Sequence, residues 1–394
     1  MTSPTPASAP VKSAAIACGG TGGHLFPGLA VGRELRRRGC AVTLLISSKE
    51  IDRQAAQGAG DMRVVALPGV GLSRVNILGF VKSFWQSYRL SNQLFRANPP
   101  DLVLAMGGFT AAPPVLAGKR FGAKTFLHES NSIPGRANRW LARWVDGVFL
   151  YFDAAGGGLG ARQVETVGMP VRPEFLQPPA QEAARELLGL QKDAPVLLVM
   201  GGSQGAHRIN ELITAALPNL VQADPRLQFI HLTGVADLKK VQAAYAAWKR
   251  PALVFSFLAE MAPALAAADV AVSRAGASSL AEFAACRLPA VLIPYPTAAG
   301  NHQFYNAQAL ERSGAAQMMA EATLEPTQLA AEILRLLGST ERRAAMKQAL
   351  AGWHSPEAAA EIAEKMLYGT TGREALPSPA LSEPKTPKLG VLNV

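Results

Sequence analysis

The chain of 394 residues alternates short apolar runs with helix-forming stretches, and the whole alternation occurs twice. Apolar runs lie in the first half at 13–20, 41–47, 101–108, 123–130 and 147–152, and in the second at 194–202, 227–234, 252–258, 268–274 and 289–296. Strands that alternate with helices form parallel sheets joined by right-handed crossovers. Two such sets, each opening with a strand that runs into Gly-Gly, predict two Rossmann-like domains.

The Pro-rich stretch at 170–179 indicates the boundary between these domains. The ends of the chain are rich in Pro, Ser, Ala and Thr, a composition typical of disordered segments. We predict a disordered N-terminus at 1–11, domains at 12–175 and 176–350, a C-terminal helix at 351–368 that packs back on the first domain, and a flexible tail at 369–394.

The net positive charge of the chain comes from its first half. Residues 1–176 hold 20 Lys and Arg against 10 Asp and Glu, whereas residues 177–394 hold 19 of each. An anionic partner is therefore expected at the N-terminal domain. Basic and aromatic residues do not alternate, so nucleic acid is not the expected partner. The three cysteines have neither disulfide nor zinc spacing, and no signal peptide or membrane-spanning run is present in the sequence.

Three glycine-rich loops follow predicted strands: GGTGGH at 19–24, Gly107-Gly108, and GGSQGA at 201–206. Glycine lets the backbone approach a ligand closely, and the start of the next helix offers free N–H groups to a phosphate. The strict G-x-G-x-x-G spacing and a P-loop lysine are both absent, which argues against a nicotinamide dehydrogenase and an ATPase. Such loops in both halves predict a cleft that holds two phosphate-bearing ligands.

Each of the polar residues near these loops can have either a functional or a structural role. His24, at a helix start, acts as a general base or only hydrogen-bonds a substrate. The segment His128–Asn131 follows a strand and either binds a ligand or caps the next helix. Glu282 lies in the helix after the strand at 268–274, where it holds a ribose diol or favours the helix N-terminus.

Residues 74–89 have the periodicity of an amphipathic helix with two distinct stripes. The stripe expected to face the core consists of Ile77, Phe80, Val81, Phe84 and Tyr88. The other stripe mixes basic and apolar side chains, namely Arg74, Leu78, Lys82, Trp85 and Arg89. That mixture suits an anionic membrane surface, and the alternative is a solvated basic face with a partly buried Trp.

Taken together, these segments resemble the MurG family of glycosyltransferases. The matching stretches follow the family order through nearly the whole chain between its two tails: GGTGGHLFPGLA (19–30), MGGFTAAPP (106–114), LHESNSIPGRANRWLA (127–142), GMPVRPEF (168–175), GGSQGAHRIN (201–210), SRAGASSLAEFAACRLPAVLIPYP (273–296) and HQFYNAQAL (302–310). Any one of these stretches is common, whereas the set is specific.

The resemblance implies an α/β GT-B fold, with two Rossmann-like domains whose parallel sheets face each other across a central cleft. It also implies an inverting hexosyltransferase of peptidoglycan synthesis. Such an enzyme moves N-acetylglucosamine from UDP-N-acetylglucosamine to the muramoyl C4 hydroxyl of lipid I, forming lipid II. The N-terminal domain would then take the acceptor and lie on the membrane, and the C-terminal domain would take the UDP-sugar.

The family's functional residues fall on positions of this sequence that match its motifs. His24 and Glu129 are the candidates for the base and its surroundings. Contact with the donor sugar or the reaction centre is implied for Thr21, Gly22, Gly23 and Asn131. Binding of UDP and its sugar is implied for Arg172, Ser203, the backbone at Leu258, Ala277, Ser278, Ser279, Leu280, Ala281, Glu282 and Gln303. Gly107 and Gly108 are expected at the acceptor diphosphate, and Leu78, Lys82 and Trp85 at the membrane.

No cofactor and no bound metal are expected, because the chain has no convincing D-x-D loop, and helix N-termini with Arg172 supply positive charge instead. The implied partners are UDP-N-acetylglucosamine, undecaprenyl-pyrophosphoryl-muramoyl pentapeptide (lipid I), an anionic membrane surface and proteins of cell-wall synthesis. The implied location is peripheral, on the cytoplasmic face of the inner membrane. Two alternatives stay open: a glycosyltransferase with a diacylglycerol or small natural-product acceptor, and a non-catalytic scaffold that binds a UDP-sugar.

Overall fold

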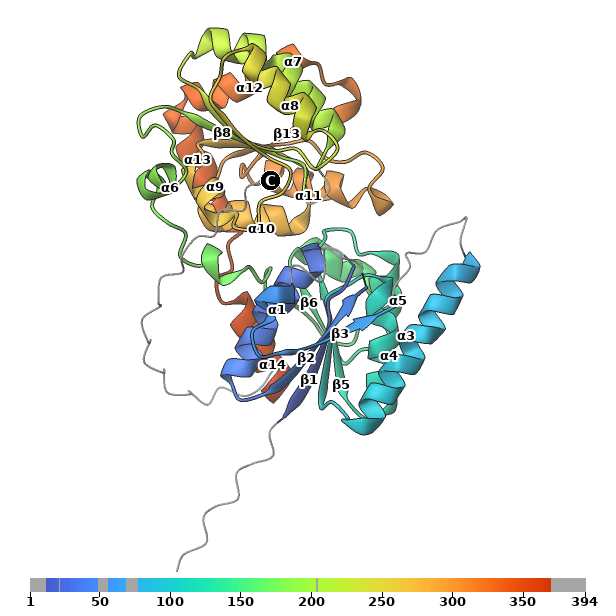
Figure 1. The fold of residues 1–394 in the computed structure, drawn as a ribbon. Helices are drawn as coiled ribbons and strands as arrows, with labels where there is room; N and C mark the ends of the chain where they lie inside the picture. The colour runs from blue at the N-terminus through green and yellow to red at the C-terminus, as the bar shows by residue number, and fades with distance from the viewer. Residues whose placement is uncertain (1–11, 21, 49–55, 69–76, 203–204, 370–394) are drawn as a thin grey trace, which may run out of the picture.

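The computed structural model describes residues 12–20, 22–48, 56–68, 77–202 and 205–369, which form two α/β domains lying one above the other (Figure 1). The predictions for the two tails, Thr21, Arg74 and Ser203 lie outside the described residues. Each domain contains one wholly parallel sheet with helices on its faces.

The N-terminal domain is built on a seven-stranded sheet in the order β3-β2-β1-β4-β5-β6-β7. Its strands are β1 (Ser13–Ala17), β2 (Ala41–Ser47), β3 (Arg63–Leu67), β4 (Leu102–Ala105), β5 (Lys124–Glu129), β6 (Gly147–Leu150) and β7 (Val164–Thr166). Its helices are α1 (Gly22–Arg37), α3 (Ile77–Ala97), α4 (Ala112–Arg120) and α5 (Arg136–Leu141), with short 3-10 turns η1 (Ala56–Ala59), η2 (Phe109–Ala111) and η3 (Asp153–Gly158). A further turn, η4 (Pro173–Phe175), begins the connection to the second domain.

The C-terminal domain repeats this arrangement with a six-stranded sheet in the order β10-β9-β8-β11-β12-β13. Its strands are β8 (Val196–Met200), β9 (Gln228–Leu232), β10 (Ala252–Phe255), β11 (Val270–Ser273), β12 (Ala290–Leu292) and β13 (Gln317–Met318). Its helices are α6 (Gln181–Leu187), α7 (His207–Ala223), α8 (Leu238–Ala247), α9 (Ala262–Ala267), α10 (Ala277–Cys286), α11 (His302–Arg312), α12 (Pro326–Gly338) and α13 (Thr340–Ala351), with 3-10 turns η5 (Ala299–Asn301) and η6 (Glu321–Thr323).

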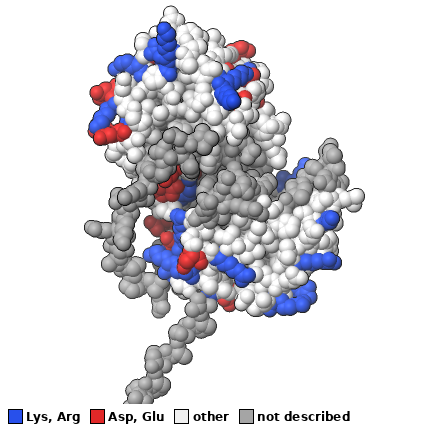
Figure 2. Space-filling model, viewed as in Figure 1, with Lys and Arg blue, Asp and Glu red and all other residues white. Residues whose placement is uncertain are grey.

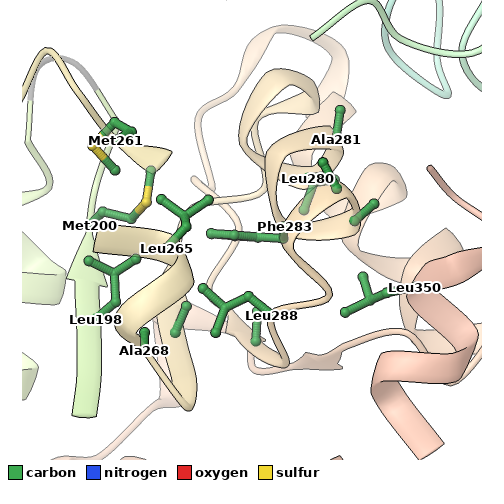
Figure 3. Close-up of a cluster of buried hydrophobic side chains, with 14 of the residues drawn as sticks. Leu198, Met200, Met261, Leu265, Ala268, Leu280, Ala281, Phe283, Leu288 and Leu350 are labelled. Carbon is green, nitrogen blue, oxygen red and sulfur yellow. The ribbon is translucent and has the colours of Figure 1, made fainter. Parts of the chain in front are cut away.

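The central strands of both sheets are buried on both faces, which explains why they are continuous apolar runs rather than alternating ones. On β1, Ile16 packs into the core on one face and Ala15 into the core on the other. In the C-terminal domain, Leu198 of β8 packs with Leu265 and Phe283 beneath α9 and α10 (Figure 3). These cores fix the strand ends, and therefore the loops that follow them.

The chain returns to the N-terminal domain at its end, through α14 (Ala358–Tyr368). Figure 1 shows α14 beside α1, and Ile362, Ala363 and Met366 are buried in the core between that helix and the sheet. Lys365 forms an ion pair with Glu165 of β7 at 2.5 Å. The C-terminal helix is therefore part of the N-terminal domain, although it begins at Ala358 rather than near 351.

The edge strands and one helix face differ from the sequence predictions. The strands β3, β7 and β13 lie at sheet edges, where the apolar signal is weakest because one side of the strand has no partner. On α3, Val81 is 45% exposed rather than in the core, and the buried positions include Ser83, Ser87 and Ser91. These small side chains let α3 pack closely on α4. The helix is therefore rotated relative to the prediction, and part of the expected apolar stripe, including Val81, faces outward. No helix among the described residues is long and apolar enough to cross a bilayer.

Candidate active site between the two domains

Four of the motif loops follow the strands at which the chain order of each sheet reverses. In the N-terminal domain the chain order reverses between β1 and β4, and these strands lead into the loops that begin at 18 and 106. In the C-terminal domain the reversal lies between β8 and β11, which lead into the loops that begin at 201 and 274. Ligands of open parallel sheets bind at such switch points. The topology therefore predicts one ligand-binding site in each domain, at the carboxyl ends of the strands that lead into these loops.

The first glycine loop is held by backbone packing. A Cβ on Gly19 would lie 2.2 Å from the backbone N of Ser47, and Gly20 has a φ of +119°. The Thr110 hydroxyl donates a hydrogen bond of 2.9 Å to the Gly19 carbonyl, which ties this loop to the one after β4. Gly22 and Gly23 then begin α1, whose N-terminus points at the domain boundary.

His24 lies in the first turn of α1, against the second glycine loop. Gly107 and Gly108 have φ values of +113° and +80°, a conformation that favours glycine. A Cβ on Gly107 would lie 3.1 Å from His24 Nε2 and 3.3 Å from Asn138 Nδ2. These glycines therefore make room for the imidazole, and the two predicted loops meet at His24.

Glu129, at the end of β5, is almost completely buried and accepts four hydrogen bonds. Its Oε1 accepts from the Asn131 backbone N–H (2.9 Å) and Nδ2 (3.2 Å). Its Oε2 accepts from the Gly135 N–H (3.1 Å) and Asn138 Nδ2 (2.7 Å). Burial raises the pKa of Glu129, and these N–H donors oppose that rise by stabilising the carboxylate. The carboxylate therefore joins the loop that follows β5 to helix α5, because Asn131 and Gly135 lie in that loop and Asn138 lies in the helix.

Asn138 was not among the sequence-predicted residues. It joins Glu129 to the neighbourhood of Gly107 and His24, and it is 5% exposed. Its place in the motif at 127–142 was visible in the sequence, whereas its burial and its bond to Glu129 appear only in the structure.

The C-terminal domain brings α10 to the N-terminus of α1. The Ser278 hydroxyl donates a hydrogen bond of 3.1 Å to the Gly23 carbonyl, so the two helix starts touch. Leu280 and Ala281 are buried in the core of the C-terminal domain (Figure 3), so their side chains do not reach this boundary. The backbone N–H groups at the start of α10, from Ala277 to Ser279, have no acceptor within the helix, and such N–H groups can bind an anion.

Arg172 lies in the connection between the domains and contacts both of them. Its guanidinium donates to Glu282 Oε1 at 3.2 Å and to the Ala259 carbonyl at 2.9 Å. It also lies over the Phe26 ring of α1, 4.5 Å from the centroid. Burial raises the pKa of Glu282, and the nearby Arg172 charge opposes that rise. Leu258 precedes Ala259 and packs on the C-terminal core, so its backbone lies beside this ion pair.

Helix α11 contributes two amide side chains. Gln303 Oε1 accepts from the backbone N–H groups of Ala275 (3.3 Å) and Tyr295 (3.0 Å) and so joins two loops of the C-terminal domain. Asn306, one turn later, is fully buried and bonds to Asn131 and Ser132 of the N-terminal domain. Asn306 lies in the motif at 302–310, but nothing in its local sequence distinguishes it from the other residues of that motif.

The predicted membrane residues lie on α3. Leu78 is 85% exposed and Trp85 is 55% exposed, with Lys82 between them in the sequence and also exposed. Figure 2 shows Lys and Arg along the edge of the domain that α3 occupies in Figure 1. Helix α3 contains Lys and Arg but neither Asp nor Glu. Trp140 and Trp144, in and after α5, are also exposed.

Comparisons with known proteins identify both domains. Residues 14–150 match the glycosyltransferase family 28 N-terminal domain, and residues 196–366 match the glycosyltransferase family 28 C-terminal domain. Relatives named UDP-N-acetylglucosamine--N-acetylmuramyl-(pentapeptide) pyrophosphoryl-undecaprenol N-acetylglucosamine transferase include that of Anaeromyxobacter dehalogenans (strain 2CP-1 / ATCC BAA-258), which is 36% identical over 94% of this chain and 96% of its own length. The protein of the same name from Syntrophus aciditrophicus (strain SB) is 40% identical over 81% of this chain and 88% of its own length.

Solved structures agree in fold. The crystal structure of Acinetobacter baumannii MurG has a TM-score of 0.70 and 26% identity, covering 91% of this chain and 99% of that one. The calicheamicin glycosyltransferase CalG4 has a TM-score of 0.63 at 18% identity, covering 92% of this chain and 100% of its own, which is a likeness of fold alone.

Proposed function

This chain belongs to the MurG family of glycosyltransferases, and from that premise we propose that it transfers N-acetylglucosamine from UDP-N-acetylglucosamine to the muramoyl C4 hydroxyl of lipid I, forming lipid II. The observation that carries this proposal is the contact between α1 and α10. The start of a helix after a glycine loop in one domain touches the start of a helix in the other. Each helix start binds anions, so two phosphate-bearing substrates can be held at one boundary.

The donor is assigned to the C-terminal side of this boundary. The N–H groups at the start of α10 suit its diphosphate, and Glu282 suits the ribose diol because a carboxylate accepts two O–H hydrogen bonds. Glu282 already forms an ion pair with Arg172, so a bound ribose either shares the carboxylate with Arg172 or replaces it. In both cases we assign Arg172 to the neighbourhood of the diphosphate, where its charge stabilises the departing UDP.

The acceptor is assigned to the N-terminal side. We assign its diphosphate to the loop at Gly107 and Gly108, whose positive φ values favour glycine, and Asn131 lies in the loop that faces the C-terminal domain. Inverting transfer needs a base that removes the proton of the acceptor hydroxyl as the bond to UDP breaks. His24 is the better candidate of the two predicted residues, because both oxygens of Glu129 already accept hydrogen bonds from its own loop. We assign Glu129 a positioning role.

The lipid-linked acceptor requires a surface that reaches the membrane, and α3 supplies one. Leu78, Lys82 and Trp85 lie on one helical face, with spacings of four and three residues. Exposed apolar side chains beside basic ones, with no acidic residue on the helix, suit an anionic bilayer surface. We therefore place the protein peripherally on the cytoplasmic face of the membrane, with α3 against the lipid, and proteins of cell-wall synthesis as its neighbours.

The experiment that tests the function measures UDP release from UDP-N-acetylglucosamine with and without a lipid I analogue. Transfer predicts acceptor-dependent release and a disaccharide product with inverted anomeric configuration. A scaffold would bind the donor without acceptor-dependent release. Release with a diacylglycerol acceptor, but none with the lipid I analogue, would identify a different glycosyltransferase.

A further inference from the structure

A single buried amide joins the two domains beside the candidate site. Asn306 of α11 is 0% exposed. Its Nδ2 donates to Asn131 Oδ1 at 3.1 Å and to the Ala275 carbonyl at 3.2 Å. Its Oδ1 accepts from the backbone N–H and the hydroxyl of Ser132, both at 2.9 Å. An asparagine amide has two donors and two acceptor lone pairs, so this side chain is used to its full capacity.

Most of these bonds cross between the domains. Asn131 and Ser132 belong to the N-terminal domain, whereas Ala275 belongs to the same domain as Asn306. A buried amide that loses its partners is costly, so a fully bonded one specifies a single relative position of the groups around it. If the domains separated, Asn306 would lose its three bonds to Asn131 and Ser132 and keep its bond to Ala275.

Asn306 is joined to the donor side through Ala275. The carbonyl of Ala275 accepts a hydrogen bond from Asn306, and the N–H of Ala275 donates one to Gln303. Gln303 lies one turn before Asn306 on α11. Ala275 also lies two residues before α10, whose first N–H groups are assigned to the diphosphate. The groups that would hold the UDP-sugar and the group that contacts Asn131 are therefore parts of one hydrogen-bonded unit.

Asn306 is joined to the acceptor side through Asn131. The Asn131 amide accepts from Asn306 through Oδ1 and donates to Glu129 through Nδ2. Glu129 in turn accepts from Asn138, which lies against Gly107. A continuous path of contacts thus leads from α11 to the glycine loop beside His24.

We propose that Asn306 is a positioning residue that couples the two halves of the site, by orienting the Asn131 amide and the 129–135 loop when the domains are in contact. This inference rests on the proposed function and deepens it. The contacts of Asn306 that bear on transfer are its bonds to Asn131 and Ser132. Donor binding is assigned to other residues, Gln303 and Glu282. Its loss should therefore slow transfer without weakening donor binding.

The test uses the full chain with Asn306→Asp. Aspartate keeps the shape and the acceptor for Ser132 but places an oxygen opposite the Asn131 and Ala275 oxygens. The matched control is Gln228→Glu, because Gln228 is also a buried amide that donates to backbone carbonyls in the C-terminal domain. Gln228 is at the amino end of β9, whereas the candidate site is at the carboxyl ends of the strands.

For Asn306→Asp we expect kcat for transfer to the lipid I analogue to fall about 10- to 100-fold. The Kd for UDP-N-acetylglucosamine, from calorimetric titration, should change by less than about threefold. The control should keep both values near those of the native chain. Because a protonated aspartic acid regains one donor, the ratio of variant to native kcat should rise as the pH falls. An equal loss of donor affinity, or an unchanged kcat, would overturn the inference.

Two further measurements keep the inference testable if the aspartate variant folds poorly. Asn306→Ala combined with Asn131→Ala should be little slower than Asn131→Ala alone, because the two residues act in series; multiplied losses would contradict the proposal. Amide hydrogen exchange at Asn131, Ser132 and Gly135 in the absence of substrates should be faster in Asn306→Ala. If the native chain transfers no sugar, the proposed function fails, and the exchange result still decides whether Asn306 orders the loop.

Discussion

Replacement of Arg172 by methionine should destabilise the protein in a way that depends strongly on pH. The guanidinium and the Glu282 carboxylate are each about 11% exposed and lie 3.2 Å apart. Methionine retains much of the packing on Phe26 and Phe175 but removes the charge. Glu282 is then a buried carboxylate without its cation. Breaking a buried ion pair by removal of one partner costs about 3–5 kcal/mol, which corresponds to a fall in Tm of about 10 °C for a domain of this size.

The pH dependence follows from the pKa of Glu282. Burial raises it and Arg172 opposes the rise, so removal of Arg172 raises the folded-state pKa further. Above the ordinary glutamate value of 4.5, the folded state then holds a proton that the unfolded chain has released. The free energy of unfolding therefore falls as the pH rises through the raised pKa, and stays at its lower value above it. The loss is full at alkaline pH and shrinks as the pH falls toward 4.5.

Thermal unfolding of the native chain, Arg172→Met, Glu282→Gln and the double variant, at about pH 8 and about pH 5, measures this effect. The double variant should recover much of the stability that Arg172→Met loses, because no buried charge is left unpaired. Equal destabilisation at both pH values, with additive losses in the double variant, would show that packing rather than charge explains the effect. That result would refute the electrostatic reasoning.

Three other predictions concern catalysis and the membrane. His24→Ala should lower kcat for transfer about 10²- to 10⁴-fold with the donor Kd nearly unchanged; a native-like kcat would remove His24 as the base. Gly107→Ala forces a Cβ to 3.1 Å from His24 Nε2 and should reduce kcat about tenfold. Gly122 also has a positive φ, of +82°, but nothing lies within 4 Å of its Cβ position, so Gly122→Ala should only lower Tm. Leu78→Ser with Trp85→Ser should weaken binding to anionic vesicles by at least about tenfold in sedimentation assays and leave transfer to a short-chain soluble acceptor unchanged; equal vesicle binding would place the membrane surface elsewhere.

The sequence was most informative where one physical signal dominated. Buried parallel strands need apolar residues on both faces, so the central strands of both sheets were recognisable as continuous runs. The glycine loops were recognisable because their backbone needs positive φ or a close approach, as at Gly107 and Gly19. The edge strands β3, β7 and β13 were missed because they are short and less buried. The partial exposure of Val81 was missed because the packing of α3 on α4 through small serines leaves no periodic apolar signal.

By itself, then, the sequence determined the fold class, the two-domain repeat, the family and the chemical type of the loops, because each depends on local residue patterns. Only the tertiary structure decided which residues act together. It showed that Leu280 and Ala281 face the core, that Glu129 holds its own loop, and that Asn306 reaches Asn131 across the domain boundary. Hydrogen bonds between residues 175 positions apart leave no trace in local spacing, because the contact exists only after both sheets have folded and met.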